Sequence, residues 1–318
     1  ISLGGEVRFL TRAADLIVQD GAVTAVKTGH PERGEEMIPA RAVVLAVGHS
    51  ARDTFQTLFE KGISMEAKAF AVGLRIQHPQ KQINLSQYGM EDPGTLGAAP
   101  YKVTRQTSNG RGVYSFCMCP GGYVVNASSE PGRLAVNGMS NHAREGINAN
   151  SALIVTVTPE DFPEMTAMGG IAFQRRLEEA AYRAGAGRIP VQLYGDFKAG
   201  EISRQFGDVE PAFCGKTAFA DLNQVLPEAL CLSLKEGIEA FGGMIRGFDR
   251  RDAILAGVES RTSSPLRIGR GETMESSVKG LYPCGEGAGY AGGITSAAMD
   301  GIKIAEAIAK RFQPSYRE

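Results

Sequence analysis

Hydrophobic positions recur at helical spacing near the end of the chain. Between Ile294 and Phe312, apolar and small residues return every three or four positions, while charged residues take the opposite side. The members of this face are Ile294, Ala297, Ala298, Gly301, Ile302, Ala305, Ile308, Ala309 and Phe312. The pattern predicts a helix over 294–312 whose Ala- and Gly-rich face lies close against a sheet.

A glycine-rich stretch precedes this helix. Leu281 and Tyr282 read as a short apolar strand, which Pro283 ends because it cannot donate to a sheet ladder. Five glycines then fall between 285 and 293, where bare backbone lets a bulky ligand approach. Glu286 offers acceptors to sugar hydroxyls, and the first turn of the helix offers free N–H groups to a phosphate or ring edge. The alternative is a glycine-rich turn before an ordinary surface helix.

Strand patterns dominate the start of the chain. We predict strands over 6–10, 13–18 and 22–27, with a tight turn at Asp20-Gly21 and a polar loop over 30–34. The run over 41–48 is apolar throughout and ends in a glycine, which predicts a strand buried on both faces, as in a parallel sheet. A helix over 54–61 follows and ends at Gly62.

A second region begins near residue 66. Phe70, Val72, Leu74 and Ile76 alternate as in a strand, and further strands are predicted over 100–104, 111–118, 122–127, 133–138 and 152–158. These favour a mainly antiparallel sheet or an open barrel. The second half is predicted to be helical over 170–184 and 227–241, with a capping box at 221–224 that opens a helix. Segments 257–260 and 266–268 lead back to the first region.

The stretch from Gly280 to Ile294 resembles a known type of sequence. Its strand, Gly-Glu-Gly, glycine run and small-residue helix are similar to the C-terminal flavin-binding segment of two-dinucleotide-binding-domain flavoproteins. The sequence of this stretch most resembles bacterial FAD-dependent dehydrogenases of the group that includes the HI0933-like and aminoacetone-oxidase-like flavoproteins. The order of a strand, a hairpin and an apolar strand closed by Gly48 resembles the same proteins.

The resemblance implies an α/β protein with two parts. Residues 1–66 and 268–318 would be the remnant of a Rossmann-like FAD-binding domain, and 67–267 an inserted α+β domain that covers a small-molecule substrate. It also implies an oxidoreductase that passes hydride or electrons through FAD, with NAD(P)H as a candidate electron donor. The residues expected to contact FAD are Ala13, Gly48, Gly285, Glu286, Gly287, Gly292, Gly293, Ile294 and Thr295.

One part of such a flavoprotein is missing. The family opens with a strand, a Gly-x-Gly-x-x-Gly loop and a helix that together hold the pyrophosphate, and no such unit occurs in these 318 residues. We therefore expect the chain to be an N-terminally truncated fragment that holds FAD weakly or not at all and is inactive by itself.

A few polar residues could carry chemistry. His49 follows the apolar strand and could act as a general acid or base near the flavin, or could help to cap the helix that follows. Arg261 sits among hydroxyl residues and could clamp a substrate carboxylate, or could belong to a polar loop between domains. His142 is expected in a solvated turn, and His30 and His78 in surface loops.

Composition narrows the function classes. Thirty-four basic residues against 35 acidic ones give a net charge of −1, so nothing favours nucleic acid or an anionic membrane as partner. Five scattered cysteines predict a reducing cytoplasm, and no run is long enough to span a membrane. Cys117 and Cys119 are interpreted as thiols in a strand or turn, unsuited to a relaxed disulfide or a shared metal ion.

Two functions of other classes stay open from the sequence. The first is a binding or scaffold protein that keeps a flavoprotein fold without redox chemistry. The second is a flavin-dependent tRNA-modifying enzyme, which would need a basic groove that the near-zero net charge does not suggest. The four dispersed histidines offer no metal-binding spacing.

Overall fold

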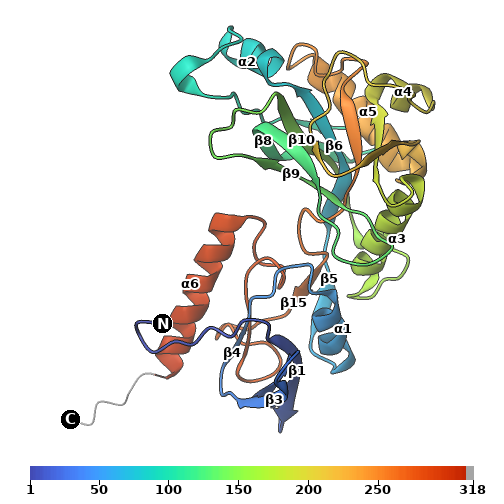
Figure 1. Ribbon diagram of the computed structural model, residues 1–318. Coiled ribbons are helices and arrows are strands. Elements are labelled where there is room, and N and C mark those ends of the chain that lie inside the picture. The colour runs from blue at the N-terminus through green and yellow to red at the C-terminus, as the bar shows by residue number, and fades with distance from the viewer. Residues whose placement is uncertain (313–318) are drawn as a thin grey trace. The chain divides into compact units, whose positions relative to one another are not determined.

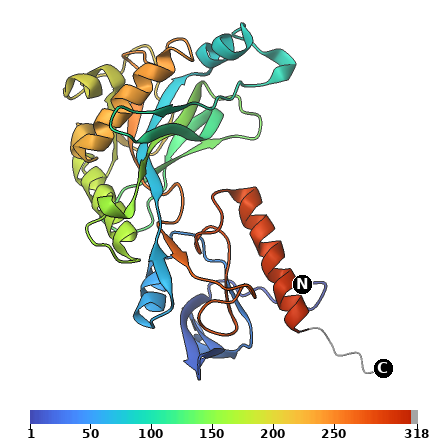
Figure 2. The same cartoon turned by 180° about the vertical axis from the view of Figure 1, so that it is seen from behind.

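The computed structural model describes residues 1–312, and they form a mixed α/β protein with one large sheet (Figures 1 and 2). The chain separates into two compact units. Unit 1 comprises Ile1–Lys68, Pro163–Ile171 and the segment from Ser263 onward, and unit 2 comprises Ala69–Phe162 and Ala172–Thr262.

Unit 2 is built on a sheet of nine strands among the described residues. Its strands are β6 (Phe70–Pro79), β7 (Thr104–Gln106), β8 (Gly112–Asn126), β9 (Val136–Ser140), β10 (Asn148–Val157), β11 (Ile189–Leu193), β12 (Phe213–Cys214), β13 (Thr217–Phe219) and β14 (Ile254–Glu259). The main path is β12-β8-β10-β6-β14-β11-β13, and β7 and β9 also pair with β8. Parallel pairing occurs between β11 and β13 and between β12 and β8, at the two ends of this path, and the rest is antiparallel. The predicted mainly antiparallel sheet is confirmed.

Helices pack on this sheet. They are α2 (Gln80–Tyr88), α3 (Gly169–Ala184), which begins in unit 1, α4 (Tyr194–Ala199) and α5 (Glu228–Gly242), with short 3₁₀ helices η1 (Gly94–Leu96), η2 (Pro159–Asp161) and η3 (Leu222–Gln224). Helix α5 lies close on β8, since a Cβ added at Gly237 would meet Val113 Cγ1 at 2.7 Å. The helices predicted over 170–184 and 227–241 are confirmed. The Asp221 side chain accepts from Asn223 N at 3.0 Å, but it caps η3 and not a long helix.

Strand β6 runs through the middle of the sheet and is buried almost along its whole length. His78 on this strand has no exposed surface, and its Nε2 lies 2.7 Å from the backbone oxygen of Phe248. The centres of the His78 and Phe248 rings lie 4.5 Å apart. The prediction that His78 occupies a surface loop was therefore wrong, because the neighbouring proline ends a central strand and not an exposed one.

The glycines of β8 serve close packing and not a turn. A Cβ at Gly121 would lie 1.8 Å from Arg144 O, and one at Gly122 would lie 2.2 Å from Met139 O. The sequence predicted two strands, over 111–118 and 122–127, whereas the structure has one strand of 15 residues. The bare backbone lets neighbouring segments approach, so β8 continues through the glycines.

Unit 1 contains three small sheets and two helices among the described residues. Its elements are β1 (Arg12–Gln19), β2 (Ala22–His30), β3 (Gly34–Pro39), β4 (Val43–Leu45), α1 (Arg52–Glu60), β5 (Met65–Ala67), β15 (Leu266–Ile268), β16 (Leu281–Pro283) and α6 (Ile294–Arg311). Strands β1, β2 and β3 form an antiparallel meander, β5 pairs with β15 antiparallel, and β4 pairs with β16 in parallel. Leu16, Leu45, Phe55 and Leu281 are among the residues of its buried core.

Some predictions in unit 1 differ from the structure. Residues 6–10 form no strand, and β3 extends the meander beyond the loop predicted over 30–34. The strand predicted over 41–48 is confined to β4, and Val44 on it is 45% exposed. Burial on both faces was wrong, because Val44, Ala46 and Val47 are exposed and only Leu45 of this run is buried.

Helix α6 confirms the predicted helix but not its predicted buried face. Ile294 is 93% exposed and Ile302 is 61% exposed, whereas Asp300 and Ile304 are buried. The side of the helix that packs against the rest of unit 1 is the one that carries Ile304, which contacts Tyr282 and Cys284. Within residues 1–312, no helix combines the length and apolar character that crossing a membrane requires.

We predict that Gly73→Ala destabilises unit 2. A Cβ at Gly73 would lie 1.9 Å from the backbone oxygen of Leu153 on the neighbouring strand, so β6 and β10 would have to separate. The expected loss is about 1–3 kcal/mol in the free energy of unfolding measured with urea. Gly112→Ala on β8 is the matched control, since its nearest neighbour would be 3.7 Å away. Equal stability of the two variants would contradict the packing described for β6.

We also predict a pH dependence from His78. Burial lowers the pKa of His78 to about 4, because a second proton would sit on Nδ1, which is buried without a partner among the described residues. The unfolded chain takes up that proton near pH 6.5, so stability falls as the pH drops from about 6.5 toward 4, by at most roughly 3 kcal/mol.

Urea unfolding at a series of pH values checks this. His78→Gln can still donate to Phe248 O but does not titrate, so it should lose less stability on acidification than the wild type. His142→Gln, at an exposed turn position, should behave like the wild type. Parallel acid profiles for the wild type and His78→Gln would refute the assignment.

Candidate functional site

The parallel pair β4–β16 brings two distant segments of unit 1 together. Val43, Val44 and Leu45 pair with Leu281, Tyr282 and Pro283 in register, and Cys284 N donates to Leu45 O at 3.0 Å. Because both strands run in the same direction, the segments that follow them emerge at one edge. Those segments are 48–49 and 285–287, and the sequence also placed both of them at a ligand site.

Three glycines allow these segments to touch. Gly48 has a φ of +67° and Gly285 a φ of +73°, the left-handed region in which glycine is favoured. A Cβ at Gly287 would lie 2.2 Å from the backbone oxygen of Gly48, so no larger residue fits there without displacing the backbone. The structure therefore brings the Gly48 turn into contact with the loop that holds Gly285 and Gly287.

His49 and Glu286 meet beside this contact. His49 Nδ1 lies 2.9 Å from Glu286 Oε1, and the two side chains are 12% and 32% exposed. The other ring nitrogen, Nε2, is buried and has no hydrogen-bond partner within residues 1–312. The pairing orients the imidazole toward Glu286 and away from the helix-capping role that was its alternative. It leaves Nε2 as a polar atom that a ligand can satisfy.

A buried ion pair holds the loop that carries Glu286. Arg270 donates to both carboxylate oxygens of Asp300 at 3.0 and 2.6 Å and to Pro283 O at 3.1 Å. Asp300 in turn accepts from Gly285 N at 2.8 Å. Hydrogen bonding from Arg270 lowers the pKa of Asp300, which keeps the carboxylate charged. The guanidinium also lies 3.5 Å from the centre of the Tyr290 ring.

The sequence did not single out Arg270 or Asp300. Asp300 fell on the predicted polar side of α6 with Lys303 and Glu306, so nothing in the helical pattern set it apart. What sets Asp300 apart is its burial, and burial is a property of the folded chain that the sequence pattern does not show.

The remaining predicted ligand residues lie in more open surroundings. A Cβ added at Gly292 would have no atom within 4 Å, and Gly293 is the extended N-cap of α6, whose N–H donates to Ser296 Oγ at 3.1 Å. Ile294 and Thr295 are exposed in the first turn. Ala13 lies elsewhere in unit 1, in a pocket of about 100 Å³ that Val44, Val47 and Thr54 also line.

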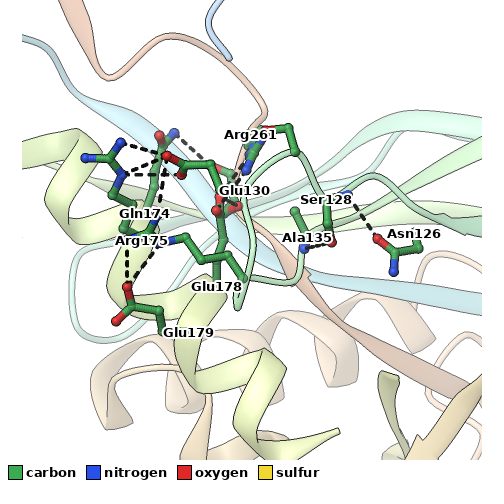
Figure 3. Close-up of polar contacts among 12 residues, drawn as sticks. Asn126, Ser128, Glu130, Ala135, Gln174, Arg175, Glu178, Glu179 and Arg261 are labelled. Atoms are coloured by element: carbon green, nitrogen blue, oxygen red, sulfur yellow. Dashed lines mark hydrogen bonds and ion pairs between the residues drawn. The ribbon is translucent and has the colours of Figure 1, made fainter. Parts of the chain in front are cut away.

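Arg261 belongs to unit 2 and is held internally (Figure 3). It forms two hydrogen bonds with Glu178, at 2.9 and 2.8 Å, and a third with Ser129 Oγ at 2.5 Å. The side chains of Arg261 and Glu178 are 9% and 0% exposed. Arg261 is thus paired with a carboxylate of α3, and its predicted contact with a substrate carboxylate stays a prediction.

The site edge can bind a ligand rich in hydroxyls and ring nitrogens. The partly exposed carboxylate of Glu286 can accept hydrogen bonds from hydroxyl groups. One ring nitrogen of His49 is held by Glu286, and the other can bond to a ligand. The glycine backbone leaves room for a large planar group. Among the described residues, no three or more His, Cys, Asp or Glu side chains are grouped so that they could hold a metal ion.

Comparison with known proteins assigns the chain to a family. The family described as "FAD-dependent protein, C-terminal domain-like" matches residues 69–262. An uncharacterised protein of Clostridium beijerinckii is 49% identical over 315 residues, which are 98% of this chain and 58% of that protein. The chain thus spans little more than half the length of this curated relative.

Among solved structures, an E. coli quinol fumarate reductase FrdA variant aligns with 96% of this chain and 46% of its own. The identity is 14% and the TM-score is 0.32, which is too low to support an inference about fold or function. The family match covers more than half of the chain, and it includes all of unit 2. The chain belongs to the family of FAD-dependent proteins with this C-terminal domain, and FAD is its cofactor.

Proposed function

We propose that this chain forms one side of the FAD site of an oxidoreductase and that unit 1 is the remnant of a Rossmann-like FAD-binding domain. The observation that carries the proposal is the meeting of His49 and Glu286 at the end of two parallel strands, directly beside the contact between Gly48 and Gly287. Ligands of open α/β sheets bind at this end of the strands. The buried Nε2, which has no partner among the described residues, fits a cofactor with hydrogen-bonding ring atoms.

Each residue would have a distinct task. Glu286 would accept hydrogen bonds from ribityl or ribose hydroxyls, and the exposed N–H groups at the start of α6 would face a phosphate or an electron-rich ring edge. Glu286 also holds Nδ1 of His49, so that His49 would hold or move a proton at Nε2. FAD, when bound, supplies the hydride or electron transfer itself.

Unit 2 would bind the substrate. It contains a pocket of about 640 Å³, a volume suited to a small molecule, whose lining includes Lys81, Arg144, Glu145 and Glu210. Charged groups of both signs favour a small polar substrate over an apolar one. NAD(P)H is the electron donor that we propose for the complete protein.

Gly293→Trp in the protein at its full natural length tests the placement of FAD. The extended backbone at Gly293 accepts any residue, and the nearest atom to a Cβ there is Ser296 Oγ at 3.9 Å, so the fold should tolerate the change. The indole would occupy the space proposed for the flavin. We expect the purified variant to lose most of its bound FAD, measured by flavin absorbance per chain.

The control for this experiment is Gly271→Trp, another open glycine of unit 1. It should keep wild-type flavin content. If Gly293→Trp retained FAD in the same ratio to protein as the wild type, the glycine loop would not contact the cofactor. If the full-length wild type itself were colourless and could not be reconstituted with FAD, the oxidoreductase proposal would fail altogether.

Glu286→Gln tests the carboxylate. The amide keeps the size of the side chain but weakens a charge-assisted hydrogen bond to a hydroxyl, which costs about 1–2 kcal/mol, or roughly a tenfold rise in the Kd for FAD. Titration of the apoprotein with FAD, followed by flavin fluorescence, measures the change. Glu272→Gln, at an exposed position of the same unit, should leave the Kd unaltered; an equal effect of both substitutions would remove Glu286 from the site.

A further inference from the structure

Two cysteines of unit 2 lie together at an irregularity in the sheet. Strand β8 pairs with β10 so that Cys119 faces Asn150 and Phe116 faces Ala152. Three steps along β8 therefore match two steps along β10, which is a β-bulge. Cys117 is the bulged residue and has a φ of +45°, a conformation that is rare outside glycine.

The bulge brings Cys119 against the backbone of Cys117. On a regular strand, side chains at i and i+2 share one face but stand about 6–7 Å apart. Here the Cys119 thiol donates to Cys117 O at 3.3 Å. The sequence interpretation of two separate thiols missed this contact, because a bulge cannot be read from the spacing of the residues.

Buried charges surround the pair. Arg75 on β6 has no exposed surface, and its Nη2 donates to Cys117 O at 2.6 Å and lies 3.7 Å from Cys119 Sγ. Its Nη1 lies 3.3 Å from Glu259 Oε2 on β14. Gly138 on β9 makes room for the guanidinium, since a Cβ there would lie 2.3 Å from Nη2. A cation is thus fixed beside the thiol pair.

The two thiols differ in acidity and in exposure. The hydrogen bond from Cys119 lowers the pKa of Cys117 to about 6, with help from the charge of Arg75, while the same bond and burial raise the pKa of Cys119. Burial raises the pKa of Glu259 to about 7 and also raises that of nearby Tyr101, which stays neutral. Cys117 is exposed and Cys119 is buried. An accessible thiolate backed by a buried thiol is the arrangement of an attacking and a resolving cysteine.

Other cysteines of the chain lack this arrangement. Cys231 and Cys284 are buried, and burial raises the pKa of each thiol, as expected for cysteines that serve packing alone. Cys117 and Cys119 do not suit a metal ion, because no third His, Cys, Asp or Glu in the described residues completes a site with them.

We propose that Cys117 and Cys119 form a dithiol–disulfide exchange centre that reduces disulfides of low molecular weight. The Cys117 thiolate attacks one sulfur of R–S–S–R′, which forms a Cys117–S–S–R bond and releases R′–S⁻. Cys119 then loses its proton and attacks Cys117 Sγ, which releases R–S⁻ and closes a Cys117–Cys119 disulfide. The proton from Cys119 and one from water convert the two released thiolates to thiols, so the substrate gains two electrons and the cysteine pair loses two.

The Cys117–Cys119 disulfide returns to the dithiol when an external dithiol attacks it, by the same two exchange steps run in reverse. This activity is independent of the flavin placement proposed for unit 1.

Oxidised glutathione serves as the probe in a Cys214→Ser background, which removes the other exposed cysteine. After reduction and desalting, this protein should release two glutathione thiols per chain and retain no glutathione. Mass spectrometry of the tryptic peptide over 112–133, which holds Cys117 and Cys119 and no other cysteine, should show the loss of two hydrogen atoms. Near pH 6 the first step should be about tenfold faster than for N-acetylcysteine, because an ordinary thiol is then almost wholly protonated.

Variants separate the two roles. Cys119→Ser and Cys119→Ala, of which the second avoids a buried hydroxyl, should stop at a stable mixed disulfide between Cys117 and glutathione. Cys117→Ser should release no thiol, while circular dichroism confirms that each variant is folded. The proposal is overturned if the Cys214→Ser protein retains glutathione in the same amount as Cys119→Ala, or if Cys117 reacts no faster than N-acetylcysteine near pH 6.

Discussion

Three arginines that are nearly removed from water each rely on a carboxylate from a distant part of the chain. Arg75 pairs with Glu259, Arg261 with Glu178 and Arg270 with Asp300. An unpaired buried guanidinium is very unfavourable, so each pair can form only when the two segments meet in one register. The first two pairs fix strands and helices of unit 2, and the third fixes the glycine loop of unit 1. The candidate site and the thiol pair are both positioned by such a contact.

Close approach between backbone segments is a second constraint on the fold. Gly73, Gly121 and Gly287 each leave too little room for a Cβ, because a backbone oxygen of another segment lies within about 2 Å of where it would be. Gly73 and Gly121 lie within strands, and Gly287 lies in a turn. They allow strands and loops to touch where a side chain would hold them apart. At Gly287 this contact sets the spacing between His49 and Glu286, so the chemistry of the edge depends on a missing side chain.

The histidines show how the surroundings divide one residue type among different tasks. His49 is oriented by Glu286 and has a buried Nε2 without a partner among the described residues, His78 is a neutral core residue, and His142 is exposed in a turn. Each follows or adjoins a strand in the sequence, and His78 was misplaced on the surface because a proline stands next to it. Cys117 gives a parallel case, since a bulge and a buried arginine distinguish its thiol from the packing cysteines.

The sequence by itself determined the elements whose signal is local. Helices α1, α3, α5 and α6 and most strands of the large sheet follow from periodicity, and the glycine run with Glu286 predicted the edge at which we propose that FAD binds. The tertiary structure decided which surfaces are buried. The apolar face of α6 is exposed, and Asp300 is buried against Arg270. Arg261 is paired with Glu178, and Cys119 lies beside Cys117. Those outcomes depend on partners far away in the chain or on a local break in strand pairing, and a pattern of neighbouring residues carries no information about either.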